Sequence, residues 1–494
     1  MRYVLAIDEG TTGATCLMIG EDGHVAGRGY REIPQYFPQP GWVEHDATEI
    51  LDCVLGAARD AIAESGGTPA AIGITNQRET VVIWERASGT PVHRAIVWQD
   101  RRTAPRCQEL APQADWIAKR TGLVVDAYFS ATKLEWLLQE QRLLYRYDCE
   151  ELAAGTIDTW LVWQLTGGAV HATDPTNASR TMLYDIDRLE WSKELCDLFR
   201  VPMEILPEVR RSSGSFGSAL PSFFGTEIPI LGIAGDQQSA LFGQGCCDRG
   251  TGKNTYGTGA FLLLNAGGER PAGGKGLLTT IGCDATGGPA YALEAAIFIA
   301  GAAVQWLRDG LGLLEKASDA EVLARSIDST GGVYFVPALT GLGAPTWEPD
   351  ARGTIVGLTR GSTRAHLVRA ALEAMAYGTA EVLESLRDAS GASFERLRVD
   401  GGATVNDWLM QFQADVLGVP VERPDMVETT ALGAAGLAGL AAGVWPDVDA
   451  FLATRTFTTF TPSMSRDDVA RLMNGWQRAV RAAVSWARDG RGDA

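Results

Sequence analysis

Apolar runs that end at polar, glycine-containing turns recur along this 494-residue chain. The first three runs, at 3–7, 16–19 and 25–30, predict three consecutive strands joined by such turns. Asp46 and Glu49 then have the spacing of a helix cap, and the apolar residues after them recur at helical period. Strands that alternate with helices predict an α/β fold.

A polar segment lies between two predicted strands in the first quarter of the chain. The run at 71–75 leads into Asn-Gln-Arg-Glu-Thr, which includes Arg78 and Glu79. An adjacent arginine and glutamate can hold neighbouring hydroxyl groups as donor and acceptor, and a solvated hairpin tip is the plain alternative. The run at 95–98 ends at Trp98, a residue type found more often in a core than at a ligand.

The stretch from Gly235 to Gly259 carries the strongest chemical pattern. Asp236 follows the apolar run 230–234, and a carboxylate at a strand end can accept a proton from a substrate hydroxyl. The Gly-Thr-Gly turn at 257–259 exposes backbone N–H groups that suit a phosphate. Asp8 leaves the first strand into a similar turn, which fits a metal-bound water beside phosphate and fits a plain hairpin equally well. Together these features predict a phosphoryl-transfer site with a polyol-like acceptor.

The second half of the chain repeats the pattern. The segment 292–306 includes Gly301 and Gln305, spaced i and i+4 on one helix face. A later strand pattern ends at a Gly-Gly pair that includes Gly402, with Asn406 just beyond. Two glycines there would let an adenine ring or ribose approach the backbone closely, whereas a bare turn is the alternative. The two halves therefore predict related α/β lobes that face each other across a nucleotide cleft.

Composition narrows the classes of function. The net charge of −18 argues against nucleic-acid binding and against an anionic membrane surface. Eight scattered cysteines without a C-x-x-C pair predict reduced thiols in a cytoplasmic protein. The uncharged run 429–446 is too short and too rich in Ala and Gly to insert in a membrane, and it predicts a packed interior helix. The length predicts two domains, with 243–252 as the best boundary.

Nucleotide motifs of other folds are absent, because the chain has no G-x-x-x-x-G-K-[ST] loop, no G-x-G-x-x-G after the first strand, and no H-R-D or D-F-G set. Other long stretches are more distinctive, namely Pro40–Asp46, Gly73–Thr80, Asn177–Met182, Ala234–Gln238, Lys253–Gly259, Tyr128–Trp136 with Lys133, and Gly353–Glu373. In these stretches, and along nearly the whole chain, the sequence resembles the FGGY carbohydrate kinases, and the last two stretches match the two signature regions of that family.

The resemblance implies an actin-like, ribonuclease-H-like fold of two lobes with a nucleotide cleft between them. Residues 1–250 would form the N-terminal lobe with the glycerol site and the first phosphate loop. Residues 251–494 would form the C-terminal lobe with the second phosphate loop and the adenosine site. The implied activity is phosphorylation of glycerol by ATP with Mg²⁺, giving sn-glycerol 3-phosphate in glycerol catabolism. A homo-oligomer, either a dimer or a tetramer, is also expected.

The same resemblance implies roles for single residues, with Asp236 as the general base. The positions that match glycerol contacts are Arg78, Glu79, Trp98, Tyr128, Asp236, Gln237 and Phe261. The positions that match nucleotide contacts are Thr11, Thr12, Gly13, Thr258, Gly301, Gln305, Gly402 and Asn406. Asp8 matches the carboxylate that serves Mg²⁺.

The first phosphate loop departs from the usual family pattern at three positions. Glu9 stands where Gln is usual, Gly13 where Ser is usual, and Thr15 where Arg is common. An added negative charge and a missing cation predict weaker ATP binding, unless Glu9 faces the metal. Elsewhere, Glu227 stands where some bacterial relatives carry the arginine of a loop that binds fructose 1,6-bisphosphate. Inhibition by fructose 1,6-bisphosphate is therefore not expected.

Three other hypotheses fit part of the pattern. A family member that acts on another small polyol or a ketose would share the motifs, although Trp98 and Phe261 suit a three-carbon chain. A non-catalytic nucleotide switch with an actin-like core would not need Asp236 for an acceptor hydroxyl. An inactive kinase is the third hypothesis, and it depends on the altered first loop.

Overall fold

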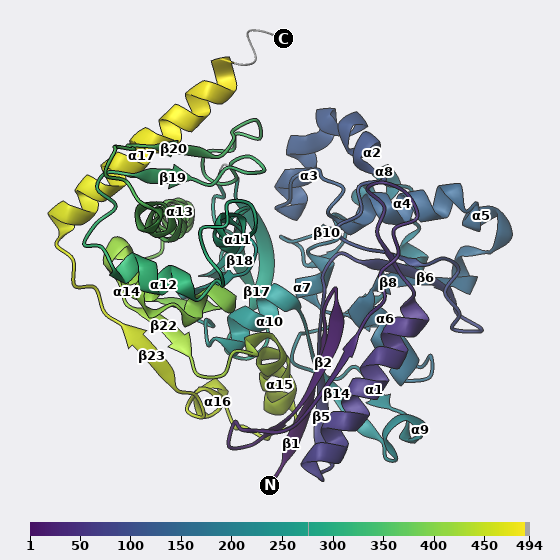
Figure 1. Ribbon diagram of the computed structural model, residues 1–494. Helices are drawn as coiled ribbons and strands as arrows, with labels where there is room; N and C mark the ends of the chain where they lie inside the picture. Colours follow the sequence, from purple (N-terminus) through teal and green to yellow (C-terminus); the bar gives the residue numbers. More distant parts are fainter. Residues whose placement is uncertain (275, 490–494) are drawn as a thin grey trace.

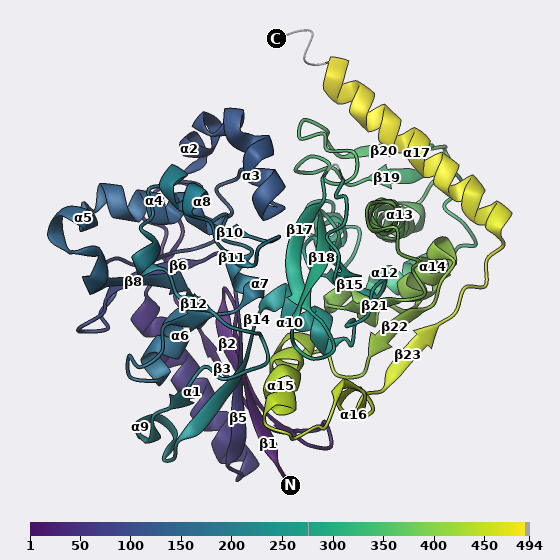
Figure 2. The ribbon, with the colours of Figure 1, turned by 180° about the vertical axis from the view of Figure 1, so that it is seen from behind.

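Two large mixed β-sheets, one in each half of the chain, organise the molecule (Figure 1). The computed structural model describes residues 1–274 and 276–489. The N-terminus lies in the lobe built on the first sheet, and the long C-terminal helix α17 (Arg466–Asp489) lies along the outer side of the other lobe (Figure 1, Figure 2).

The first sheet has the strand order β13-β14-β5-β1-β2-β3. Its strands are β1 (Tyr3–Glu9), β2 (Gly13–Gly20), β3 (Val25–Glu32), β5 (Pro69–Asn76), β13 (Ser218–Ala219) and β14 (Ile228–Gly235). The first three strands form an antiparallel meander, and β5 and β14 then add in parallel to β1. The three consecutive strands predicted from the apolar runs are confirmed.

The second sheet repeats this arrangement in the order β17-β18-β16-β15-β21-β22-β23. Its strands are β15 (Gly252–Tyr256), β16 (Ala260–Gly267), β17 (Leu278–Cys283), β18 (Pro289–Ile297), β21 (Leu397–Asp400), β22 (Val421–Pro424) and β23 (Phe457–Phe460). Here too three neighbouring antiparallel strands, β15, β16 and β18, are followed by two strands parallel to the first of them, although β17 now comes between β16 and β18 in the sequence. The repeated topology confirms the predicted pair of related α/β lobes with an actin-like fold.

Helices cover both sheets. Asp46 caps α1 (Ala47–Ser65) by accepting from the backbone N–H groups of Thr48 and Glu49, as its spacing predicted. The other main helices are α4 (Ser130–Glu140), α6 (Ile157–Leu165), α10 (Asp236–Gly243), α11 (Gly301–Asp309), α12 (Asp319–Arg325), α13 (Arg364–Ser390), α14 (Asp407–Leu417) and α15 (Thr429–Ala441). Each sheet buries one large apolar cluster beneath such helices.

Smaller elements connect these layers. A four-stranded sheet contains β4 (Glu44–His45), β6 (Val81–Glu85), β7 (Ala95–Ile96) and β8 (Leu152–Thr156). Short strand pairs are β9 (Ala172–Thr173) with β12 (Glu208–Val209), β10 (Tyr184–Asp185) with β11 (Glu190–Trp191), and β19 (Tyr334–Val336) with β20 (Thr354–Val356). Short helices are α2 (Ala104–Glu109), α3 (Ala114–Thr121), α5 (Leu143–Arg146), α7 (Pro175–Ala178), α8 (Lys193–Leu198), α9 (Pro221–Phe224) and α16 (Val448–Leu452).

Helix α15 joins the two halves of the chain. It comes from the second half, yet it lies beside the first sheet (Figure 1, Figure 2). Its buried Leu432 and Ala435 share an apolar cluster with Val4 and Ala6 of β1. The uncharged run therefore forms the packed interior helix that its small residues predicted. No helix in the described part of the chain is long and apolar enough to cross a membrane.

One element differs from its prediction. The segment 292–306 is not a continuous helix, because β18 extends to Ile297 and α11 begins only at Gly301. Strand β18 pairs antiparallel with both β16 and β17, and this pairing outweighs any helical tendency of its alanines. Gly301 and Gln305 still lie on one helix, as expected.

Candidate active site

Arg78 and Asp236 lie together at the carboxyl ends of two neighbouring strands of the first sheet, next to the second lobe. Strands β5 and β14 are parallel and in register, with Thr75 opposite Ala234, so their carboxyl ends meet at one edge. Arg78 follows β5, and Asp236 is the first residue of α10 after β14. The Nε of Arg78 lies 3.1 Å from an Asp236 carboxylate oxygen. The Arg78 side chain is buried, whereas that of Asp236 is 34% exposed, so the carboxylate remains open to a small molecule.

A buried network of alternating charges surrounds Arg78. Its Nη1 lies 2.6 Å from a carboxylate oxygen of Glu294, which comes from β18 in the other lobe. Arg180 completes the network, with its Nε 2.7 Å from Glu79 and its Nη2 3.2 Å from Glu294. Burial opposes ionisation of Glu294, but the charges of Arg180 and Arg78 outweigh it and lower its pKa to about 2. Glu294 is therefore a carboxylate that holds two arginines of the first lobe.

Sequence reasoning missed Glu294 and Arg180 as members of this site. Arg180 lies within Asn177–Met182, one of the stretches that carry the family resemblance, but no role was attached to it. Glu294 is the single charged residue of the otherwise mostly apolar strand β18, and an isolated charge in a buried strand is a signal of a buried partner. The partner itself was not predictable, because it lies 216 residues away in the sequence.

Two of the three aromatic residues predicted to contact glycerol, Trp98 and Tyr128, lie near Arg78. The rings of Trp98 and Tyr128 meet edge to face with centroids 5.4 Å apart, and the Tyr128 hydroxyl lies 3.5 Å from Nη2 of Arg78. Phe261 comes from the other lobe, on β16. The strand register places Phe261 on the same sheet face as Glu294, because Leu263, two residues along, pairs directly with Glu294.

Gln237 is held by a buried lysine that sequence reasoning did not assign. The ammonium of Lys253 donates to Oε1 of Gln237 and to Oγ1 of Thr255, both at 2.6 Å. Burial lowers the pKa of Lys253, although the negative charges of Asp400 and Asp236 act against this shift. With its oxygen occupied, the Gln237 side chain has its amide NH₂ left to donate to a substrate oxygen.

The predicted first phosphate loop is the turn between β1 and β2. The N–H of Gly10 donates to the carbonyl of Gly13 at 3.0 Å, which closes the turn. The indole N–H of Trp98 donates to Oγ1 of Thr11 at 2.9 Å, so the loop is tied directly to the aromatic wall. Thr12 is exposed at the tip of the turn. The three predicted residues Thr11, Thr12 and Gly13 therefore lie together, on the lobe opposite Thr258.

Asp8 has the environment of a cation ligand. Burial, together with the nearby negative charges of Asp236 and Glu428, raises the pKa of Asp8 to about 8. A divalent cation would favour the ionised form of this carboxylate. No group of three or more His, Cys, Asp or Glu side chains within residues 1–274 and 276–489 forms a complete metal cage. One carboxylate beside a phosphate loop suits Mg²⁺, which binds proteins through one or two carboxylates and takes its other ligands from water and phosphate.

Glu9 faces the interior and not the loop. It is fully buried, and its Oε1 accepts from Nε2 of Gln77 at 2.8 Å. Burial raises the pKa of Glu9 well above its ordinary value, an effect that the hydrogen bond from Gln77 only partly offsets. The Glu9 carboxyl group is therefore directed away from the turn of Thr11, Thr12 and Gly13, and burial disfavours its ionised form.

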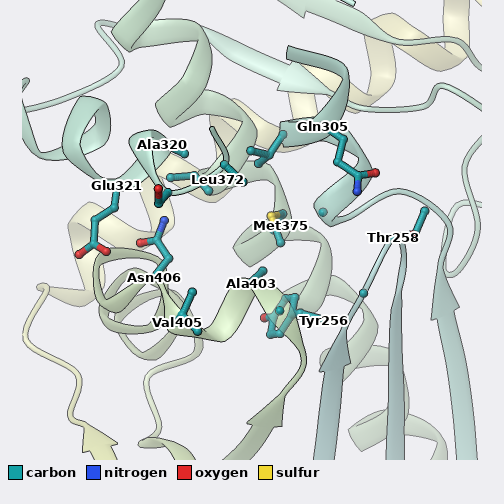
Figure 3. A pocket seen from close by; sticks show the side chains of 16 residues that line it. Tyr256, Thr258, Gln305, Ala320, Glu321, Leu372, Met375, Ala403, Val405 and Asn406 are labelled. Atoms are coloured by element: carbon teal, nitrogen blue, oxygen red, sulfur yellow. The ribbon is translucent and has the colours of Figure 1, made fainter. Parts of the chain in front are cut away.

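The second lobe contains a cavity of about 480 Å³ next to the Gly-Thr-Gly turn (Figure 3). Five of the predicted nucleotide residues line it, namely Thr258, Gly301, Gln305, Gly402 and Asn406. Most of the remaining lining is apolar, including Leu372 and Met375, which suits the flat face of a purine. A Cβ added at Gly402 would meet no atom within 4 Å, so this glycine leaves the space beside the backbone open.

Comparison with known proteins agrees with this geometry. The N-terminal domain model of the FGGY family of carbohydrate kinases matches residues 3–243, and the C-terminal domain model matches residues 252–442. The chain belongs to the FGGY family of carbohydrate kinases.

Similar members of the FGGY family share the full length of the chain. Glycerol kinase of Halorhodospira halophila is 53% identical over 99% of this chain and 98% of its own. Glycerol kinase of Dechloromonas aromatica is 54% identical over 98% of both chains. The crystal structure of Plasmodium falciparum glycerol kinase with ADP superposes with a TM-score of 0.93 at 37% identity, over 98% of both chains. Gluconate kinase of Lactobacillus acidophilus, with a TM-score of 0.88 at 20% identity, shares the fold.

Proposed function

We propose that this FGGY kinase transfers the terminal phosphoryl group of ATP to glycerol and forms sn-glycerol 3-phosphate. The observation that carries the proposal is the partly exposed Asp236 carboxylate, held 3.1 Å from Arg78 where the two lobes meet. The full-length relatives at 53% and 54% identity, which are glycerol kinases, support glycerol as the acceptor. The alternative of another small polyol or a ketose as acceptor is not favoured.

In the proposed mechanism Asp236 is the general base. Its carboxylate would accept the proton of the attacking terminal hydroxyl as the new P–O bond forms and the bond from the terminal phosphorus to the bridging oxygen breaks, which releases ADP. Arg78 and Glu79 would donate to and accept from the other hydroxyls, and Gln237 would donate its amide N–H. The two buried arginines hold these groups in place before glycerol binds, so little reorganisation is needed during the reaction.

Selectivity for glycerol follows from the same contacts. Trp98, Tyr128 and Phe261 would cover the carbon chain, and each buried polar partner left without a hydroxyl would cost roughly 1–3 kcal/mol. An analogue that lacks a hydroxyl should therefore bind poorly. A longer sugar would have to displace an aromatic wall.

ATP would span the two lobes. Its adenosine would occupy the cavity lined by Gly301, Gln305, Gly402 and Asn406. Its phosphates would lie between Thr258 on one lobe and the turn of Thr11, Thr12 and Gly13 on the other. In this division residues 1–250 would carry the glycerol site except for Phe261, and residues 251–494 would carry Phe261 and the adenosine site. Closure of the lobes would exclude water, which otherwise competes with glycerol as acceptor.

Asp8 would hold Mg²⁺ at the phosphates. The bound cation would neutralise charge on the phosphate oxygens during transfer. The raised pKa of Asp8 supports this assignment, because the carboxylate lies among negative charges that a cation would balance.

A coupled assay of ATP consumption over a panel of acceptors tests the proposed function. The panel contains glycerol, dihydroxyacetone, erythritol and D-xylulose, each with ATP and Mg²⁺. We expect the highest kcat/KM for glycerol and the product to be sn-glycerol 3-phosphate. Faster turnover of erythritol or xylulose would favour the other family activity, and ATP consumption that does not depend on any acceptor would contradict a kinase.

A further inference from the structure

Tyr30 occupies the space that a side chain at position 13 would fill. Gly13 has no side chain, and a Cβ built on it would lie only 2.6 Å from the hydroxyl oxygen of Tyr30 and 2.6 Å from its ring carbon Cε2. Side chains do not approach that closely, so the tyrosine ring and any residue larger than glycine at position 13 exclude each other. The Tyr30 hydroxyl therefore lies at the position where the loop itself would carry a side chain.

The strand register places Tyr30 on the face of the sheet that carries Asp8. Thr15 of β2 pairs directly with Asp8 of β1 on one side and with Tyr30 of β3 on the other. Directly paired residues of antiparallel strands project from the same face, and neighbouring strands are about 4.8 Å apart. Asp8 and Tyr30 are thus two strands apart, roughly 10 Å at the backbone, and a tyrosine side chain spans much of that distance.

The hydroxyl of Tyr30 is free to bind a ligand. The side chain lies on an edge strand and the residue is 51% exposed. Within the described residues the hydroxyl has no hydrogen-bond partner. Its neighbour on the same face of β3, Arg28, is by contrast paired with Glu428 at 2.7 Å and is not available to neutralise a phosphate.

We propose that the phenolic hydroxyl of Tyr30 donates a hydrogen bond to the β-phosphate, which ATP and ADP share, in place of a side chain at position 13. This inference rests on the proposed nucleotide site, and it identifies a contact from a strand outside the phosphate loop. A phosphate oxygen is a charged acceptor, so one such hydrogen bond is stronger than a neutral one.

Calorimetric titration of the full chain with ATP, ADP and adenosine tests the contact. Tyr30→Phe removes only the hydroxyl and keeps the ring against Gly13. We expect the Kd of ATP and ADP to rise about 5- to 20-fold and the Kd of adenosine to stay unchanged, because adenosine has no phosphate. Tyr145→Phe, at a residue that is 92% exposed on α5, is the matched control and should change none of the three.

A second variant tests whether position 13 and Tyr30 share one role. Gly13→Ser supplies a hydroxyl from the loop and forces the exposed Tyr30 ring to move aside. In this background Tyr30→Phe should no longer weaken ATP binding. Equal effects of Tyr30→Phe in both backgrounds would contradict the exchange of roles.

The outcomes separate this inference from the proposed function. Wild-type affinity for ATP and ADP in Tyr30→Phe would overturn the Tyr30 contact, even if the enzyme phosphorylates glycerol. An equal loss for adenosine would also overturn it, because the effect would then not depend on phosphate. A chain that binds ATP through Tyr30 but does not phosphorylate glycerol would overturn only the proposed function.

Discussion

At the scale of single residues, Asp236 is the side chain whose chemistry is hardest to replace. Asp236→Asn keeps the size of the group and removes its ability to take up a proton. We expect kcat to fall at least roughly 10²-fold, because general-base catalysis typically contributes that much. The Kd of glycerol should change little. Steady-state kinetics and calorimetry on the variant measure both quantities.

Asp248→Asn, at an exposed aspartate beyond α10, is the matched control and should keep wild-type turnover. Near-normal kcat in Asp236→Asn would remove Asp236 from the proposed role.

Thr15 offers a second test, because it stands between Asp8 and Tyr30 in the first sheet. Thr15→Arg would add a cation on the face that carries the first phosphate loop. We expect the KM for ATP to fall about 3- to 10-fold, because a guanidinium forms charge-assisted hydrogen bonds with phosphate. Thr15→Gln, which adds length without charge, is the control. An unchanged or higher KM for ATP in Thr15→Arg would show that this position does not face the phosphates.

At the scale of elements, α15 depends on glycines that let backbones approach closely. A Cβ on Gly433 would lie 1.8 Å from the carbonyl oxygen of Ser239 in α10. Gly433→Ala should therefore force the two helices apart and destabilise the protein by roughly 1–3 kcal/mol. Gly268→Ala is the control, because a Cβ there meets nothing within 4 Å. Thermal unfolding of both variants measures the difference, and equal midpoints would contradict the tight packing of α10 on α15.

The sequence predicted helices and strands better than it predicted contacts between residues far apart in the chain. The ends of β1, β5 and β14 were predictable to within two residues, because the apolar runs stop at Ile7, Thr75 and Ala234 and a polar residue follows within two positions. The limits of β18 were not, since alanines within 292–300 suit a helix as well as a strand, and only pairing with β16 and β17 decides between them. The contact of Arg78 with Glu294 was out of reach for another reason, because it forms only when two separate sheets meet.

At the scale of the whole molecule, Glu294 links the lobes through two buried ion pairs. Glu294→Gln would leave Arg78 and Arg180 without this carboxylate. We expect the free energy of unfolding to fall by about 3–5 kcal/mol at pH 7, because removing one partner of a buried ion pair usually costs that much. Glu190→Gln, in an exposed pair with Arg188, is the control and should change stability by less than about 1 kcal/mol.

The pH dependence of stability gives a second test of the role of Glu294. The folded-state pKa of Glu294, about 2, lies below the ordinary value of 4.5. Glu294 therefore stabilises the folded protein above pH 4.5, and this contribution is lost as the pH falls toward 2. Unfolding midpoints of the wild type should decline more steeply than those of Glu294→Gln as the pH is lowered from 5 to 3. Parallel declines would contradict the assigned pKa direction.

The placement of α15 on the first sheet has a consequence for how the chain can be divided. A fragment ending near residue 250 would contain all six strands of that sheet, yet one face of it, including Val4, Ala6 and Ala71, would be left bare to water. Such a fragment should aggregate when expressed alone and should be rescued by co-expression of the remainder. A circular permutant in which α15 stays covalently attached to the first sheet should instead remain monodisperse. The boundary between the two sheets in the sequence is therefore not a boundary between two units that fold independently.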